Sequence, residues 1–204
     1  MTNTEAKALV ILLHGVGSSG ADLAALVPVM APALPGIVFD APNAPHPCDF
    51  NSGHQWFSVV GVTAENRAER IRAARGAFDA VVSESIKRNG FYGRLDRVAF
   101  LGFSQGTIMA LDALVSGRWP VGAVVGLSGR LSTDDMADNI PPTPVLLQHG
   151  AMDGVIPVGE TLEAERRLKA LGVPVETLIV QSLGHSISAE GINRASAFLA
   201  RHLA

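Results

Sequence analysis

The segment from Arg97 to Leu114, "RVAFLGFSQGTIMALDAL", places Ser104 between Gly102 and Gly106, after strand-forming residues and before a run with helical spacing. A Gly-x-Ser-x-Gly sequence at such a strand-to-helix bend is typical of a nucleophile elbow, because side chains two residues either side of the strained serine would collide. The serine oxygen then projects from the carboxyl edge of a sheet, above the positive end of the following helix. A Gly-rich turn with an N-capping serine is the structural alternative, and the flanking strand and helix favour the nucleophile.

A serine hydroxyl needs a base to react at neutral pH, and the base needs an acid to orient it. In folds with a nucleophile elbow, the catalytic residues follow one another along the chain in the order Ser, then Asp or Glu, then His. Three of the six histidines precede Ser104; we interpret His149 as a turn residue and His202 as a solvated residue of the last helix. His185, in the loop "VQSLGHSIS", is therefore the predicted base. Its structural alternative is a surface histidine.

The predicted acid is Asp153, in "LLQHGAMDGVIP", because a carboxylate at a strand's carboxyl end can reach a histidine on the neighbouring loop. An Asp-Gly turn is its structural alternative. Solvation or helix capping explains Asp134, Asp135 and Asp138, in the polar connection "STDDMADN". Asp112 lies within the helix after the serine, where we expect it to point outward.

A tetrahedral oxyanion needs hydrogen-bond donors. One predicted donor is the amide of Gln105, the residue after the nucleophile; the other comes from the loop after the first strand, "HGVGSSG", where we choose the amide of Val16. A tight strand-to-helix connection is the alternative for this loop. A phosphate-binding turn is disfavoured, since the GxGxxG spacing and the lysine of a phosphate loop are missing.

Apolar side chains near these residues could form an acyl pocket. The predicted walls are Phe50, Trp56 and Phe57 on one side, with Val155 and Ile156 beside the acid loop. Core packing under a long loop is the alternative for the aromatic residues, and for Trp56 the two interpretations stand equal.

Short apolar runs alternate with longer stretches of helical period, which is typical of a mostly parallel sheet with helices on both faces. Helices are predicted within 64–90 and 159–172 and from about Ser188 to the end. Two Pro-containing stretches, 41–61 and 133–144, are predicted loops, and the whole chain, 1–204, is predicted to form one domain. The predicted strands are Ala8–His14, Ile37–Asp40, Arg97–Phe103, Val121–Leu127, Pro144–His149 and Val175–Val180.

Composition narrows the class of protein. Of 204 residues, 48% are apolar and 17% are charged, which is too apolar for disorder, and no apolar run has the length that stable membrane insertion requires. The formal net charge of -3 argues against nucleic acid as a partner. The single cysteine, Cys48, excludes an internal disulfide framework and suits a reducing compartment. Since the N-terminus shows no basic leader, we expect a cytoplasmic protein.

The ordered set "LLHGVGSSG", "APNAP", "QWF", "GFSQGTIMAL", "LSG", "HGAMDGVIP" and "LGHSIS" resembles the phospholipase/carboxylesterase family of α/β-hydrolases, which includes the acyl-protein thioesterases. The resemblance spans nearly the whole chain and implies the α/β-hydrolase fold without a large cap domain. It also implies the nucleophile, acid, base and oxyanion amides chosen above. The chain departs from many relatives at Val16, where they have Leu, at Ser18-Ser19, where an Asp is common, and at Thr107, where a Gly often stands.

These residues predict a serine carboxylesterase that cleaves esters of short to medium acyl chains through an acyl-enzyme, without metal or cofactor. The expected partner is a small-molecule ester or thioester, and a homodimer stays open. One alternative is a lysophospholipase or acyl-protein thioesterase. The other is a hydrolase-like binding module without catalysis, which an intact set of site residues disfavours.

Overall fold

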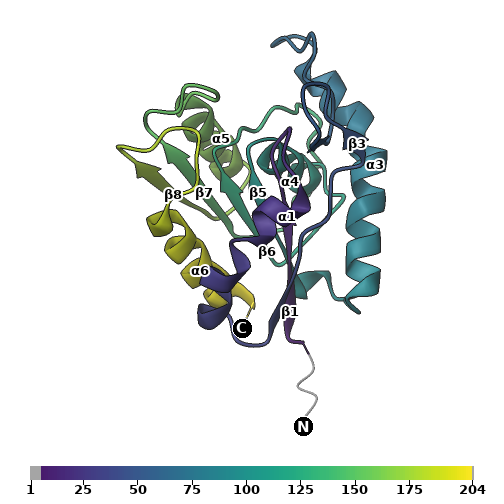
Figure 1. The fold of residues 1–204 in the computed structure, drawn as a ribbon, viewed down its shortest axis with the longest axis vertical. Helices are drawn as coiled ribbons and strands as arrows, with labels where there is room; N and C mark the ends of the chain where they lie inside the picture. The colour runs from purple at the N-terminus through teal and green to yellow at the C-terminus, as the bar shows by residue number, and fades with distance from the viewer. Residues whose placement is uncertain (1–5, 204) are drawn as a thin grey trace.

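A six-stranded parallel sheet forms the centre of the structure, a computed structural model that describes residues 6–203 (Figure 1). The strand order is β2-β1-β5-β6-β7-β8, and every neighbouring pair is parallel. This arrangement confirms the predicted fold class, and each strand overlaps its predicted range. The strands are β1 (Ala8–Leu13), β2 (Ile37–Asp40), β5 (Val98–Phe103), β6 (Ala123–Leu127), β7 (Val145–Gly150) and β8 (Val175–Val180).

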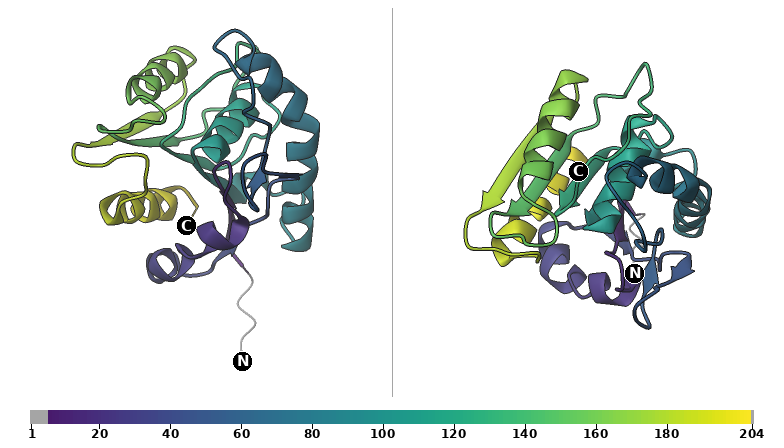
Figure 2. Two further views of the ribbon diagram at one scale, coloured as in Figure 1. Left: turned by 45° about the horizontal axis from the view of Figure 1, so that its top comes forward. Right: turned by 90° about the horizontal axis from the view of Figure 1, so that it is seen from above.

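Helices cover both faces of the sheet (Figure 2). One face carries α3 (Arg67–Arg88), α4 (Gln105–Val115) and α5 (Gly159–Ala170); the other carries α1 (Gly20–Ala24), α2 (Val27–Met30) and α6 (Ala189–Leu203). Two 3-10 turns, Ala31–Ala33 and Leu95–Arg97, complete the helical segments within residues 6–203. In this part of the chain no helix combines the length and apolarity needed to cross a bilayer.

Strand β1 shows how one sequence supplies two cores. All six of its residues are fully buried. Because side chains alternate along a strand, Leu9, Ile11 and Leu13 pack with α3 and α4, whereas the residues between them pack with α2 and α6. A strand buried on both faces has a continuous apolar sequence, as β1 does. The loop that contains Gly15 and Val16 begins where β1 ends, at the carboxyl edge of the sheet.

Short elements in two segments were not predicted. Helix α1 begins with a capping box in which the Ser19 side chain accepts from the Asp22 amide and the Asp22 carboxylate accepts from the Ser19 amide. Within the predicted 41–61 loop, β3 (His46–Pro47) pairs antiparallel with β4 (His54–Gln55). Elements of two to five residues carry too few periods to stand out in the sequence.

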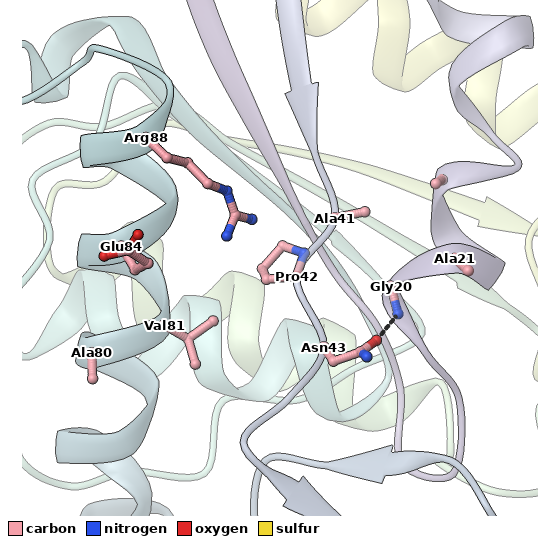
Figure 3. A pocket seen from close by; sticks show the side chains of 10 residues that line it. Gly20, Ala21, Ala41, Pro42, Asn43, Ala80, Val81, Glu84 and Arg88 are labelled. Carbon is pink, nitrogen blue, oxygen red and sulfur yellow. Dashed lines mark hydrogen bonds between the residues drawn. The ribbon is translucent and has the colours of Figure 1, made fainter.

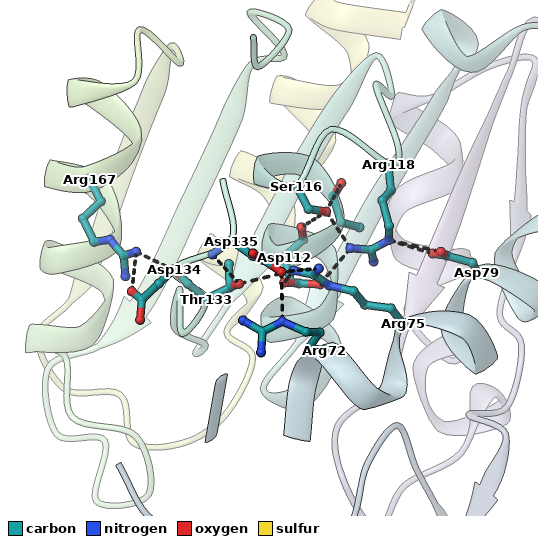
Figure 4. Close-up of polar contacts among 11 residues, drawn as sticks. Arg72, Arg75, Asp79, Asp112, Ser116, Arg118, Thr133, Asp134, Asp135 and Arg167 are labelled. Carbon is teal, nitrogen blue, oxygen red and sulfur yellow. Dashed lines mark hydrogen bonds and ion pairs between the residues drawn. The ribbon is translucent and has the colours of Figure 1, made fainter. Parts of the chain in front are cut away.

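The prediction that Asp112 points outward is wrong, because every residue of α4 is buried and the helix has no solvent face. The Asp112 side chain is only 1% exposed. Arg75 donates to it through Nε and Nη2 at 3.0 and 2.8 Å, and Arg118 donates through Nη1 at 3.0 Å (Figure 4). Asp112 therefore joins α4 to α3 and to the chain that follows α4.

Asp112→Ala is expected to lower the free energy of unfolding by about 3 kcal/mol, because two half-buried guanidinium groups lose their shared partner. Urea unfolding measures the change. The matched control is Asp134→Ala: the Asp134 side chain is 90% exposed and meets Arg167 only at 3.5 Å, so the expected loss is under about 1 kcal/mol. Equal losses in the two variants would contradict the structural role of Asp112.

Candidate active site

Ser104 lies in the bend between β5 and α4, with a φ of 52°, in the left-handed region that non-glycine residues rarely adopt. The two flanking glycines make this bend possible. A Cβ at Gly106 would lie 1.9 Å from the Leu13 carbonyl oxygen, and a Cβ at Gly102 would lie 2.5 Å from the Gly106 carbonyl carbon. The Ser104 side chain makes no capping hydrogen bond, so the structural alternative of an N-capping serine finds no support.

The loop between β8 and α6 brings His185 to this bend. Its Nε2 lies 3.0 Å from Ser104 Oγ, and its Nδ1 lies 2.7 Å from Asp153 Oδ2. A carboxylate can only accept, so Nδ1 carries the hydrogen and Nε2 is the acceptor for the serine hydroxyl. Three residues far apart in the sequence thus form one hydrogen-bonded chain at the carboxyl edge of the sheet.

Asp153 is buried in the turn after β7, and its oxygens are fully used. Oδ1 accepts from the amides of Val155 and Ile156, at 2.8 and 2.9 Å. Burial opposes ionisation of Asp153, but the hydrogen bonds from His185 and from these amides together hold the pKa of the carboxyl below its ordinary value of 3.8. Asp153 is therefore an anion above that pH, and its contribution to stability is lost only as the pH falls through its lowered pKa.

His149 is a second histidine on the same carboxylate, and the interpretation of it as a turn residue is wrong, since it lies fully buried in β7. Its Nε2 is 3.0 Å from Asp153 Oδ2 and 2.8 Å from the Ile156 carbonyl oxygen, so this nitrogen carries a hydrogen. Its Nδ1 is 2.7 Å from Thr161 Oγ1 in α5. His149 thus connects the turn that contains Asp153 to α5, and it contacts the same carboxylate oxygen as His185.

His149→Leu is expected to lower kcat by about tenfold or more with a smaller change in KM, because the Asp153 carboxylate loses a hydrogen-bond donor whereas His149 itself does not line the cavity. Steady-state kinetics on one ester measure both constants. His149→Gln, which keeps an N–H donor, should recover part of the loss. A purely structural role would instead lower the fraction of folded enzyme, with no rescue of kcat per folded molecule.

The two amides predicted as oxyanion donors, those of Val16 and Gln105, have no hydrogen-bond acceptor within residues 6–203. Gln105 is the first residue of α4, so its N–H has no partner within the helix, and the Val16 amide has no acceptor among residues 6–203 either. The loop after β1 passes close to the nucleophile: a Cβ at Gly15 would lie 3.2 Å from Ser104 Cβ. Both predicted donors therefore flank Ser104.

The side chain of Gln105 has a role that the sequence did not reveal. Its Oε1 accepts from the Trp56 amide at 2.8 Å and its Nε2 donates to the Phe57 carbonyl oxygen at 2.7 Å, both buried. His14 holds the same region: its Nε2 accepts from the Ala44 amide at 2.9 Å, and burial lowers the pKa of this imidazole, which stays neutral. These contacts attach the 41–61 segment to the elbow.

A cavity of about 310 Å³ opens onto Ser104. Three of the predicted pocket residues, Phe57, Val155 and Ile156, line it. Trp56 does not: it is 1% exposed, packs edge-on against Phe78, and donates through Nε1 to the His14 carbonyl oxygen. Phe50 also lies outside the lining and is 68% exposed. Of the two interpretations of Trp56, the structure therefore supports packing in the core.

A larger hollow of about 850 Å³ lies elsewhere, between α1 and α3 (Figure 3). Small side chains and the Asn43 side chain, which accepts from the Gly20 amide at 2.8 Å, form much of its wall, with Glu84 and Arg88 on α3. Among the described residues, no serine, cysteine or histidine lines it. Within residues 6–203, no group of three or more His, Cys, Asp or Glu side chains is arranged to hold a metal ion. The candidate active site is therefore the cavity beside Ser104 and not this larger hollow.

The parallel sheet, the elbow after β5 and the absence of a large cap define an α/β-hydrolase. The crystal structure of esterase PE8 superposes with a TM-score of 0.88 at 35% sequence identity, covering 98% of this chain and 94% of that one. The family model for Phospholipase/Carboxylesterase matches residues 1–203, and the chain belongs to this family of hydrolases. The resemblance found in the sequence is thereby confirmed.

Two relatives carry names that describe activities. Esterase YpfH of Escherichia coli (strain K12) is 32% identical, over 97% of this chain and 82% of that protein. Acyl-protein thioesterase 1 of Gibberella zeae is 28% identical, over 96% of this chain and 91% of that protein. This chain is accordingly a hydrolase of the carboxylic ester class.

Proposed function

We propose that this enzyme hydrolyses carboxylic esters of short to medium acyl chains with Ser104 as nucleophile, His185 as base and Asp153 as acid. The observation that carries the proposal is the imidazole of His185, which lies within hydrogen-bond distance of both the Ser104 hydroxyl and the Asp153 carboxylate. The tautomer that the carboxylate imposes leaves Nε2 free to take the serine proton.

The proposed reaction is a two-step acyl transfer. Ser104 Oγ attacks the ester carbonyl while His185 Nε2 takes its proton, and the amides of Val16 and Gln105 stabilise the oxyanion. The imidazolium then protonates the departing alcohol. Water attacks the acyl-enzyme with His185 as base again, and the acid leaves. Asp153 stabilises the imidazolium in both steps, and the reaction needs no metal or cofactor.

The size of the cavity supports the proposed chain length. Small-molecule sites range from roughly 300 to 1,000 Å³, so a cavity of about 310 Å³ stands at the small end. Phe57, Val155 and Ile156 supply apolar contacts for an acyl chain beside the nucleophile. Trp56 and Phe50 do not line the cavity and so are not proposed to bind the substrate.

A series of p-nitrophenyl esters with two to sixteen acyl carbons, together with one acyl thioester, tests this proposal. We expect kcat/KM to be largest at short to medium chains and the protein to react stoichiometrically with a fluorophosphonate probe. Largest activity on the thioester or on long chains would favour the thioesterase or lysophospholipase alternative. Absence of both turnover and labelling would contradict catalysis and favour a binding module.

A further inference from the structure

Two arginines line the cavity that contains Ser104, and the mechanism above uses neither. Arg67 is the first residue of α3, and Arg130 follows β6. They come from distant parts of the chain, and the positive charge of Arg67 repels that of Arg130. No acidic residue lines this cavity. Two like charges therefore line a cavity whose other walls are mostly apolar.

The protein leaves most donors of these two guanidinium groups unused. Arg130 is only 12% exposed, and within residues 6–203 its single hydrogen bond runs from Nη1 to Glu160 Oε1, at 3.2 Å. Arg67 has no hydrogen bond or ion pair through its side chain in this part of the chain; the exposed Glu65 interacts with it only at Coulombic range. Since a guanidinium has five N–H donors, a ligand in the cavity could accept several.

The position of Arg67 is also electrostatically unfavourable in the free protein. The N-terminal end of a helix carries partial positive charge and favours anions. A cation there, next to a second cation, conflicts with local electrostatics, and such conflicts concentrate at functional sites. Burial opposes the charge on Arg130 and lowers its pKa, and repulsion from Arg67 lowers it further, whereas attraction by Glu160 and Asp153 counteracts both. A bound anion would offset the repulsion between the two arginines and would compensate Arg130 for its lost hydration.

We propose that Arg67 and Arg130 form a subsite for an anionic group of the ester substrate, a carboxylate or a phosphate, so that the enzyme prefers esters that carry a negative charge near the scissile bond. The planar fork of arginine matches both groups. This inference rests on the proposed esterase function, and it names the substrate class that the apolar walls alone do not define.

Matched substrate pairs test it. The carboxylate pair is mono-p-nitrophenyl adipate and its methyl ester, which differ by one charge and place it on the acyl side. The phosphate pair is 1-butyrylglycerol 3-phosphate and 1-butyrylglycerol, with the charge on the alcohol side. We expect kcat/KM for the anionic member to exceed that of the neutral member by about 10- to 100-fold in at least one pair. The pair with the larger ratio identifies the anion.

The variants Arg67→Gln and Arg130→Gln should each lower this ratio by about tenfold, mainly through KM, and the double variant should bring it near one. Arg70→Gln is the matched control, since Arg70 lies on the same helix but is exposed and lines a different hollow. It should leave the ratio unchanged. Added salt should lower the ratio in the wild type and not in the double variant.

Failure of this inference differs from failure of the esterase function. Ratios near one in both pairs, with neutral esters hydrolysed, would overturn the subsite and leave the esterase intact. If no ester is hydrolysed, calorimetry decides the subsite: adipate or glycerol 3-phosphate should bind the wild type at least about tenfold more tightly than the double variant. Equal binding to both proteins would overturn it.

Discussion

Ser104→Ala is expected to lower kcat/KM for a short-chain p-nitrophenyl ester by about 10,000-fold or more. The hydroxyl is the only group at the elbow that can form the acyl-enzyme, and alanine leaves His185 without a proton to take. The residual rate comes from the oxyanion donors and from binding alone. Ester hydrolysis in purified protein measures the loss, and labelling by a fluorophosphonate probe should disappear with it.

Ser128→Ala is a demanding control for this result. Ser128 follows the neighbouring strand β6, is buried, and shares the positive φ of Ser104, at 48°, but no histidine within residues 6–203 forms a hydrogen bond with its side chain. Its replacement should change kcat/KM by less than about threefold. Retention of near-normal hydrolysis by the Ser104→Ala protein would overturn the assignment of the nucleophile, provided that both variants unfold at similar urea concentrations.

Asp153→Asn should lower kcat by about 1,000- to 10,000-fold. The amides of Val155 and Ile156 both donate to Oδ1, so the asparagine oxygen must occupy that place. The new NH₂ then faces the N–H of His185. To avoid two donors in contact, His185 moves its hydrogen to Nε2, and that nitrogen can no longer accept the serine proton.

The control for this variant is Asp138→Asn, an exposed aspartate in the 133–144 loop, for which no change in kcat is expected. A matched measurement is the rate of fluorophosphonate labelling, which should fall with kcat because it uses the same activated hydroxyl. Loss of less than about tenfold in the Asp153→Asn protein would mean that His185 is oriented by another group.

The sheet and the candidate triad could be predicted because their signals are local or follow chain order. Strands β1 and β5, for example, are continuous apolar runs in the sequence. The bend at Ser104 is indicated by Gly102 and Gly106, where any larger side chain would collide with the backbone. With Ser104 as nucleophile, the expected order of acid and then base along the chain favours Asp153 and His185 over the other aspartates and histidines. The structure brings these three side chains together.

The remaining site features depend on contacts between distant segments, which no local pattern encodes. Nothing around His149 announces that its ring contacts the acid turn and Thr161, and nothing around Arg67 places it beside Arg130. Asp112 had a weak signal: its helix is apolar on every side, which is typical of a fully buried helix and should have predicted a paired carboxylate.

The two hydrogen bonds of the Gln105 side chain have a consequence for how the enzyme can adapt. Gln105, whose amide is a proposed oxyanion donor, also forms side-chain hydrogen bonds with the backbone of Trp56 and Phe57. Moving the backbone of Trp56 and Phe57 outward to admit a bulkier acyl chain would break both hydrogen bonds. It would also shift Gln105 and with it this proposed donor. Diversification of substrate range is therefore easier at side chains that line the cavity without a hydrogen bond to Gln105, such as those of Val59 and Val62.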